Sequence, residues 1–525
     1  MERRSFLYHS CAAAAGASFS LKGMPLNTAP QKSFLEALSF NGNPENRVLV
    51  LIELNGGNDG INTFIPLDQY SNLSKFRRNL LIPERNVLRL QGTRASGLHP
   101  SMALFQKMYN DGLVSVVQNV GYPEQDYSHF RSSDIWMSAS DADVNLENGW
   151  AGRYLEQRYP GFPTGYPSDA NPDPLAIQLG AVMSLALVGS QWPMGMAITD
   201  PKAYYEFVNS VVEPAPDGPF GDELEYIRLV TQQAQQYFKS VKGAADKGRN
   251  QSTLYPPEEK NYLADQLKIV AQLIKGGLKT PIYICTLHGF DTHSEQINPS
   301  GNPLEGNHAE LLQMLSEAIY AFQDDLKLMG IDDRVAGMTF SEFGRTIGSN
   351  GSFGTDHGAA APLFVFGKAV NPGIIGKNPL VPSDLGESDD LPMEHDFRAI
   401  YMTILKDWFG LEQPESILGQ KFPILPIFKS ISTPTRDLQT VESFDLNLRP
   451  NPFRESSTIN LQTNGGQVTI RVLDGLGKVV QTVAEGYYPA GTHQFVLQRQ
   501  NLPMGQYYCQ VNVNGTIGVR KVIAM

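Results

Sequence analysis

The chain has 525 residues, of which 41% are hydrophobic and 18% are charged, so it can form one large domain with an apolar core and a second, smaller domain. Its formal net charge of −12 argues against a nucleic-acid-binding surface, which needs clustered Lys and Arg. No apolar run reaches the roughly 18 residues that indicate a membrane span. Three cysteines cannot form a disulfide framework, and we expect Cys285 and Cys509 to be free thiols.

The first residues predict an export signal over residues 1–30. Arg3-Arg4 stands shortly before Phe6-Leu7, and a stretch of small residues follows, as in twin-arginine signals. The alternative is a disordered tail. A signal of this kind would carry the chain into the periplasm.

Apolar runs along the chain predict the strands of one sheet. Residues 47–54 (RVLVLIEL) and 281–287 (PIYICTL) are nearly continuous apolar runs, typical of strands that helices cover on both faces. Two shorter strands are predicted at Val335–Phe340 and Leu363–Phe366. Segments with helical spacing lie between the strands. We therefore predict an α/β main domain over residues 47–412, with a mostly parallel sheet flanked by helices.

The loop between the two shorter strands concentrates charged and metal-binding side chains. It contains Glu342, Arg345, Asp356 and His357, with several glycines that permit tight turns. Adjacent Asp and His residues supply metal ligands in many sites, but one such pair is weak evidence, so further ligands must come from elsewhere in the chain.

Two other predicted strand ends carry ligand types. Asp291 and His293 are two residues apart, so their side chains would point the same way from an extended segment; a purely structural pair is the alternative. Asp59 lies at the end of a glycine-rich turn, where it could serve either as a metal ligand or as a cap of the following helix. Because ligands bind beyond the carboxyl ends of parallel strands, we expect these loops to converge.

Ser128 and His129 begin a predicted helix and would lie at the same edge of the sheet. A serine at this position has two interpretations, which the sequence leaves open. It can cap the free backbone N–H groups of the helix, or it can act as a nucleophile whose substrate oxyanion those groups receive.

The end of the chain predicts a separate domain. Prolines mark a linker over residues 413–445. From residue 446 to 525, polar and apolar residues alternate between Gly, Asn and Pro, which predicts a small antiparallel β-sandwich.

Six pieces of the main domain point to one family: LNGGNDG, YSHFRSSDIW, GFDTH, FSEFGRT, the Asp356-His357 pair after it, and DFRAIYMTILKDWFG. They resemble the bacterial family called domain of unknown function 1501, which is grouped with alkaline phosphatases and sulfatases. The resemblance implies an alkaline-phosphatase-like fold and a metal-dependent hydrolase of phosphate or related esters. The alternative is a non-catalytic cell-surface or binding protein that retains the fold.

The resemblance also implies roles for particular residues. The implied metal ligands are Asp291, His293, Asp356 and His357, with Asp59 and Glu342 as further candidates. Ser128 is the candidate nucleophile, with His129 and Arg345 as the other catalytic candidates. The mixture of carboxylate and imidazole suits a divalent ion such as zinc or manganese. No Cys/Ser-x-Pro-x-Arg motif of sulfatases stands near residue 128.

The last segment, with its NPF, DGLG and LPMGQYY pieces, resembles the C-terminal sorting domain of type IX secretion. The resemblance implies the type IX secretion machinery as a partner. It also implies the cell surface or the extracellular space as the destination.

Overall fold

The computed structural model describes residues 20–21, 24–25, 46–200, 234–384, 389–429, 446–473, 479–499, 502–513 and 516–524. The chain divides into two compact units, Met1–Ile431 and Ser432–Met525. The predicted export signal lies almost entirely outside the described residues. Within it, the structure describes only β1 (Ser20–Leu21) and β2 (Met24–Pro25), which form an antiparallel pair.

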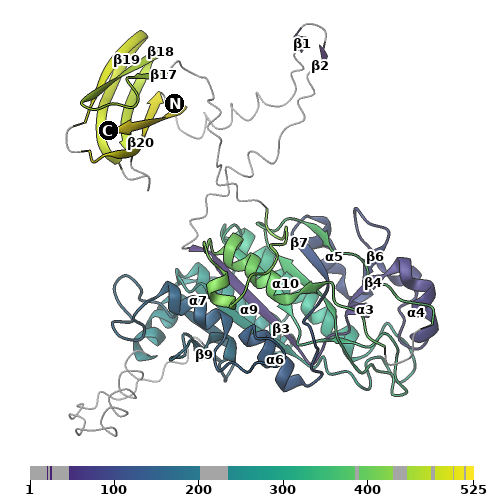
Figure 1. The fold of residues 1–525 in the computed structure, drawn as a ribbon. Coiled ribbons are helices and arrows are strands. Elements are labelled where there is room, and N and C mark those ends of the chain that lie inside the picture. Colours follow the sequence, from purple (N-terminus) through teal and green to yellow (C-terminus); the bar gives the residue numbers. More distant parts are fainter. Residues whose placement is uncertain are drawn as a thin grey trace, which may run out of the picture. The chain divides into compact units, whose positions relative to one another are not determined.

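The first unit is built on a nine-stranded sheet (Figure 1). Its strands are, in spatial order, β15 (Gly373–Ile375), β7 (Val114–Gly121), β14 (Ala361–Phe366), β11 (Val335–Phe340), β3 (Val48–Asn55), β10 (Ile282–His288), β8 (Ala176–Leu179) and β9 (Met196–Ile198), with β16 (His395–Asp396) paired to β7. β14 runs antiparallel to β7 and β11. The remaining pairings among the described strands are parallel, so the mostly parallel sheet is confirmed.

Helices cover both faces of this sheet. One face carries α5 (Ala103–Asn110), α9 (Tyr262–Lys275) and α10 (Asn307–Leu328), and the other carries α6 (His129–Ser138), α7 (Trp150–Arg158), α11 (Phe397–Thr403) and α12 (Glu415–Leu418). Strand β3 contributes side chains to the core on both faces of the sheet, because successive side chains point to opposite faces. Val50 and Ile52 belong to the first core, and Leu49 and Leu51 belong to the second. Each buried side chain of this kind contributes about 1.5–3 kcal/mol, so the sheet is a rigid base for the loops at its ends.

Short elements complete the first unit. They are α3 (Gly60–Thr63), α4 (Tyr70–Phe76), a three-stranded sheet of β4 (Phe64–Pro66), β6 (Ser96–Leu98) and β5 (Leu88–Arg89), 3₁₀ helices at Leu67–Gln69, Glu84–Asn86, Pro100–Met102 and Leu185–Leu187, and a π-helix at Ile404–Trp408. The loop between β11 and β14 forms a small ribbon of β12 (Gly344–Arg345) and β13 (His357–Gly358), which places Arg345 opposite His357.

The segment at the start of the predicted linker packs as part of the first unit. Ile417, Leu418, Leu425 and Ile427 are buried in the second core. The backbone N–H of Lys429 donates to the carbonyl of Ala369. Apolar side chains between the prolines therefore hold residues 413–429 against the main domain.

The second unit contains one antiparallel sheet of five strands. They are β17 (Leu446–Arg449), β18 (Ser456–Leu473), β19 (Val479–Gln498), β20 (Gly505–Val513) and β21 (Thr516–Ala524). The predicted antiparallel character is confirmed. The described strands form one connected sheet, because the long β18 pairs with β19 along one edge and with both β17 and β20 along the other.

Two further expectations can be compared with the described residues. Cys285 and Cys509 are free and buried, as predicted. Among the described helices, none has the length and apolar character required to cross a membrane.

Candidate metal centre

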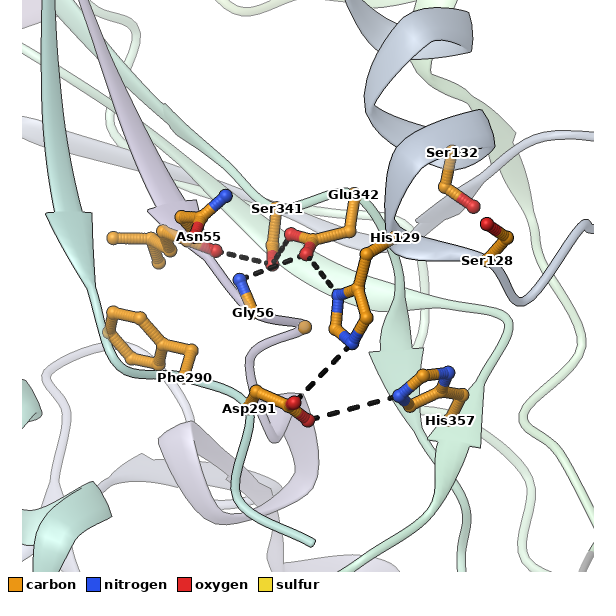
Figure 2. Close-up of polar contacts among 12 residues, drawn as sticks. Asn55, Gly56, Ser128, His129, Ser132, Phe290, Asp291, Ser341, Glu342 and His357 are labelled. Atoms are coloured by element: carbon orange, nitrogen blue, oxygen red, sulfur yellow. Dashed lines mark hydrogen bonds and ion pairs between the residues drawn. The ribbon is translucent and has the colours of Figure 1, made fainter.

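Three side chains from separate elements meet beyond the carboxyl ends of the central strands. His129 begins α6, Asp291 follows β10, and His357 lies on β13. One ligand atom from each lies within 4.8 Å of the others. Nε2 of His129 is 3.6 Å from Oδ2 of Asp291, and Nε2 of His357 is 3.9 Å from Oδ1 of Asp291. Figure 2 shows both imidazole rings directed toward this carboxylate.

The loops after β3, β10 and β11 converge because these strands are neighbours in the sheet. Gly56, with a φ of +125°, lets two loops touch, since a Cβ there would lie 2.2 Å from the backbone nitrogen of Asp291. The buried guanidinium of Arg345 donates to the carbonyls of Gly56, Gly57, Thr355 and Phe290. Arg345 therefore holds the loops together.

A buried carboxylate orients the His129 ring. Nδ1 of His129 is 2.8 Å from Oε1 of Glu342, which also accepts the N–H of Gly56 at 2.9 Å. Glu342 is 2% exposed. A carboxylate oxygen accepts the hydrogen bond, so Nδ1 of His129 is the donor to Glu342 and Nε2 is the ring nitrogen that faces Asp291.

The backbone orients His357 in the same way. Its Nδ1 is 2.6 Å from the carbonyl oxygen of Tyr127, which can only accept, so Nδ1 is the protonated nitrogen. Its Nε2 is buried and has no hydrogen-bond partner among the described residues. Burial lowers the pKa of His357, and the charges of Arg345 and the other histidines add to this, against the opposing effect of the bond to Tyr127. The neutral ring has a lone pair available for a ligand.

Asp291 completes the group as the anionic member. Its Oδ1 accepts from Arg345 at 2.9 Å and from Nδ1 of His293 at 2.6 Å. Partial desolvation acts to raise the pKa of Asp291, but the hydrogen bond from Arg345 and the nearby positive charges outweigh it and hold the pKa below the usual range. Asp291 is therefore ionised at neutral pH, with Oδ2 directed at His129.

The donor set fits a divalent transition ion. Ligand atoms about 2.1 Å from a tetrahedral ion lie roughly 3.4 Å apart. The separations of 3.6 Å and 3.9 Å, which involve different oxygens of Asp291, are larger than this. Two imidazoles and one carboxylate are ligand types that divalent metal ions take in proteins. The unpartnered Nε2 of His357 supplies the clearest sign of a fit, because a buried lone pair without a donor is costly.

The structure places some predicted ligands in supporting positions. His293 lies beside the group, its ring 4.5 Å from that of His357, and its Nδ1–H donates to Asp291. The carboxylate of Glu342 contacts His129 and does not point into the space between the three ligands. Both residues orient ligands in the way that carboxylates and backbone groups orient metal-binding histidines elsewhere.

Asp59 has a different environment from the one expected. Its side chain is completely buried against Arg77, whose Nη1 lies 2.6 Å from Oδ2, and it also accepts from Gln296 at 2.6 Å and from the N–H of Asn62. Burial acts to raise the pKa of Asp59, but Arg77 and the other donors hold it below its ordinary value. Asp59 caps α3 and forms a buried ion pair, so its oxygens are occupied.

Asp356 and Ser128 also lie outside the group. Asp356 is exposed, and its Oδ1 accepts from Asn350 at 3.1 Å. Ser128 is the N-cap of α6, and its side chain accepts from the N–H of Arg131 at 3.5 Å. Its hydroxyl is exposed one residue before His129.

The sequence did not indicate two supporting residues. Tyr127 acts through its backbone carbonyl, which no side-chain pattern reveals. Gln296 lies in an irregular loop and becomes notable only because of its contacts.

A cavity of about 860 Å³, lined by Asp68, Tyr109, Asn378 and their neighbours, contains none of the three clustered residues.

Family models match both units of the chain. Residues 118–420 match the model described as protein of unknown function, DUF1501, which is more than half of the chain. The chain belongs to the DUF1501 family. Residues 447–525 match the model described as a secretion system C-terminal sorting domain. That domain marks this DUF1501 protein for export to the cell surface or the extracellular space.

Solved structures similar to this DUF1501 chain include members of the alkaline phosphatase superfamily. A superfamily protein from Vibrio parahaemolyticus is 12% identical, with 93% of this chain and 91% of the other covered and a TM-score of 0.32. A sulfatase from Pseudoalteromonas sp. is 13% identical, with 93% and 91% covered and a TM-score of 0.32. A phosphonate monoester hydrolase from Silicibacter pomeroyi is 10% identical, with 91% and 88% covered and a TM-score of 0.31.

These TM-scores are low, so the three likenesses carry no inference about the chemistry of this chain. A search of the curated proteins found no match.

Proposed function

We propose that this exported protein is a metal-dependent hydrolase of phosphate or related esters, with His129, Asp291 and His357 as the metal ligands. One observation carries the proposal: the buried Nε2 of His357 has no hydrogen-bond partner in the part of the chain that the structure describes, while its Nδ1 is fixed by the Tyr127 carbonyl. A buried imidazole nitrogen that faces an ionised carboxylate and lies beside a second histidine is an arrangement that suits a cation.

The side chains around the site have distinct tasks in this proposal. A bound divalent ion would act as a Lewis acid on the ester and stabilise charge on the leaving oxygen. Glu342 fixes the tautomer of His129, and Arg345 and His293 fix Asp291. Arg345 is fully buried, so it positions Asp291 and the loops and does not reach substrate. Ser128 is the candidate nucleophile, because its exposed hydroxyl precedes His129.

The site is open to solvent on one side. The side chain of Asp291 is 50% exposed and that of His129 is 33% exposed. An ester group can therefore approach the ligands from the surface without movement of the sheet. This access suits a substrate whose organic part remains in solvent.

The test is an activity screen of the full chain, purified without chelators, on phosphomonoesters, phosphodiesters and sulfate esters. Zn²⁺, Mn²⁺, Mg²⁺ and Ca²⁺ are each added in turn, and bound metal is verified by elemental analysis. We expect turnover of at least one phosphate ester with Zn²⁺ or Mn²⁺. Absence of turnover on every ester with a verified metal load would contradict hydrolysis.

A second candidate is a non-catalytic surface or binding protein with the same fold. The burial of Asp59 and Arg345 favours it, because two residues expected to take part in chemistry are held in structural contacts. The same screen separates the two functions, since the second one predicts metal binding without turnover.

We also propose that the export signal at the N-terminus delivers the chain to the periplasm. The type IX machinery then recognises the C-terminal unit and carries the protein across the outer membrane. The match of residues 447–525 to a sorting domain supports the second step.

A further inference from the structure

Gln296 lies in the loop between β10 and α10, the loop that also carries Asp291, and its side chain is fully buried. All four of its polar groups have partners. Its backbone N–H donates to the carbonyl of Phe353, and its own carbonyl accepts the N–H of His308. Its side-chain oxygen and nitrogen contact three further residues. A buried amide with this many contacts fixes several segments at once.

The side-chain oxygen of Gln296 joins the two loops that carry the ligands. Oε1 accepts from the hydroxyl of Thr292 at 3.2 Å and from the hydroxyl of Thr355 at 2.9 Å. Thr292 stands between Asp291 and His293, and Thr355 stands two residues before His357. The backbone N–H of Thr355 also donates to the carbonyl of Thr292 at 3.2 Å. A shift of Gln296 would therefore displace both loops.

The loops pack closely at this junction. Gly354 lies so near the neighbouring loop that a Cβ there would be 2.3 Å from the carbonyl oxygen of His293. Separation of the loops by even a fraction of an ångström would lengthen the bond from Thr355 to Gln296.

The side-chain nitrogen anchors Gln296 to the rigid part of the domain. Nε2 donates to Oδ2 of Asp59 at 2.6 Å, and Asp59 pairs with Arg77. Arg77 in turn donates to the carbonyls of Thr346 and Ile347, close to β12. The position requires a side chain that accepts two hydroxyl donors at one end and donates to a carboxylate at the other. A glutamine amide meets both requirements.

We infer that Gln296 is a positioning residue for the metal centre, which keeps Asp291 and His357 at the separation that one ion requires. The inference rests on the proposed metal site and assigns Gln296 no contact with the ion or the substrate. The buried ion pair of Asp59 and Arg77 serves as its fixed support. Gln296 affects metal affinity indirectly, because its hydrogen bonds to Thr292 and Thr355 fix the positions of Asp291 and His357.

The experiment measures Co²⁺ affinity by visible absorption in the full chain after removal of metal with a chelator. The variants are Gln296→Met, which removes the amide at similar volume, Thr355→Val, which removes one hydroxyl, and Thr355→Ser, which retains it. The matched control is Thr403→Val in α11, because Thr403 is also fully buried and its hydroxyl bonds to Ala399 and accepts from Leu425.

We expect Gln296→Met and Thr355→Val to bind Co²⁺ about tenfold more weakly than wild type, which is a common effect of replacing residues that orient metal ligands. Thr355→Ser should retain the wild-type affinity. Thr403→Val should lose stability in thermal unfolding but keep its affinity. Equal affinity of Gln296→Met and wild type would overturn the inference. So would an equal loss of affinity in Thr403→Val, since general destabilisation would then explain the effect.

A metal-free readout separates failure of this inference from failure of the proposed function. If wild type binds no Co²⁺, the metal site and the proposed function are wrong. Hydrogen exchange of the amides of Gln296 and Thr355 then still tests the junction. Faster exchange at these amides in Gln296→Met than in Thr403→Val supports the coupling of the loops, and equal rates refute it.

Discussion

Replacement of Asp59 by alanine tests whether this residue supports the fold or binds metal. Both members of the Asp59–Arg77 pair have completely buried side chains, so Asp59→Ala leaves a guanidinium without its counter-charge inside the protein. Removal of one partner from a buried pair costs about 3–5 kcal/mol. Arg77 keeps its bonds to the carbonyls of Thr346 and Ile347, so we expect the lower end of that range.

The assay is urea unfolding followed by tryptophan fluorescence. All four tryptophans lie before residue 431, so the signal reports on the main unit alone. The double variant Asp59→Leu with Arg77→Met should recover much of the lost free energy, because it leaves no buried charge. The control is Glu84→Ala, which breaks the Arg89 pair whose side chains are half exposed, at an expected cost below about 1 kcal/mol.

The metal content distinguishes the two roles of Asp59. Folded Asp59→Ala should bind as many equivalents of Co²⁺ at saturation as wild type, because Asp59 supplies no ligand atom in this structure. A cost of Asp59→Ala no larger than that of Glu84→Ala, together with a lower metal-to-protein ratio, would refute the reasoning and return Asp59 to the ligand set.

Four other predictions address the site, the pH response and export. His357→Ala should lower bound metal in elemental analysis while circular dichroism stays near that of wild type; equal metal ratios would contradict the site. Ser128→Ala should abolish ester turnover at a cost of about 1 kcal/mol for the lost cap, and an active variant would leave Ser128 a cap only. Burial lowers the pKa of His99 to about 3 and that of His308 to about 4, so the folded state resists protonation that the unfolded state accepts near pH 6.5. The contribution of these two histidines to the free energy of unfolding should be complete above pH 6.5. It should fall by about 1.4 kcal/mol per pH unit for each histidine as the pH drops toward 4, and a flat free energy of unfolding between pH 7 and 5 would argue against this prediction. Deletion from residue 446 onward should leave the main unit folded and retain it in the periplasm, whereas unchanged surface delivery would disprove the sorting role.

Local patterns in the sequence determined most of the sheet. The apolar run of β3 is buried on both faces, and Val335–Phe340 forms β11 with the predicted bounds. Both follow from short-range rules, because burial on two faces requires continuous apolar residues and turn residues end a strand. The spacing of Asp291 and His293 likewise placed a carboxylate and an imidazole together, since their side chains are close in the sequence as well as in space.

Only the tertiary structure decided what each polar side chain faces. Asp59 and Asp356 both follow glycine-containing turns, yet one is buried against Arg77 and the other is exposed. His129 joins Asp291 although 162 residues separate them in the sequence, because α6 begins beside the loop after β10. The tautomer of His357 depends on the backbone of Tyr127, 230 positions away. Contacts of this range arise from packing of the sheet and its loops, and therefore no local pattern encodes them.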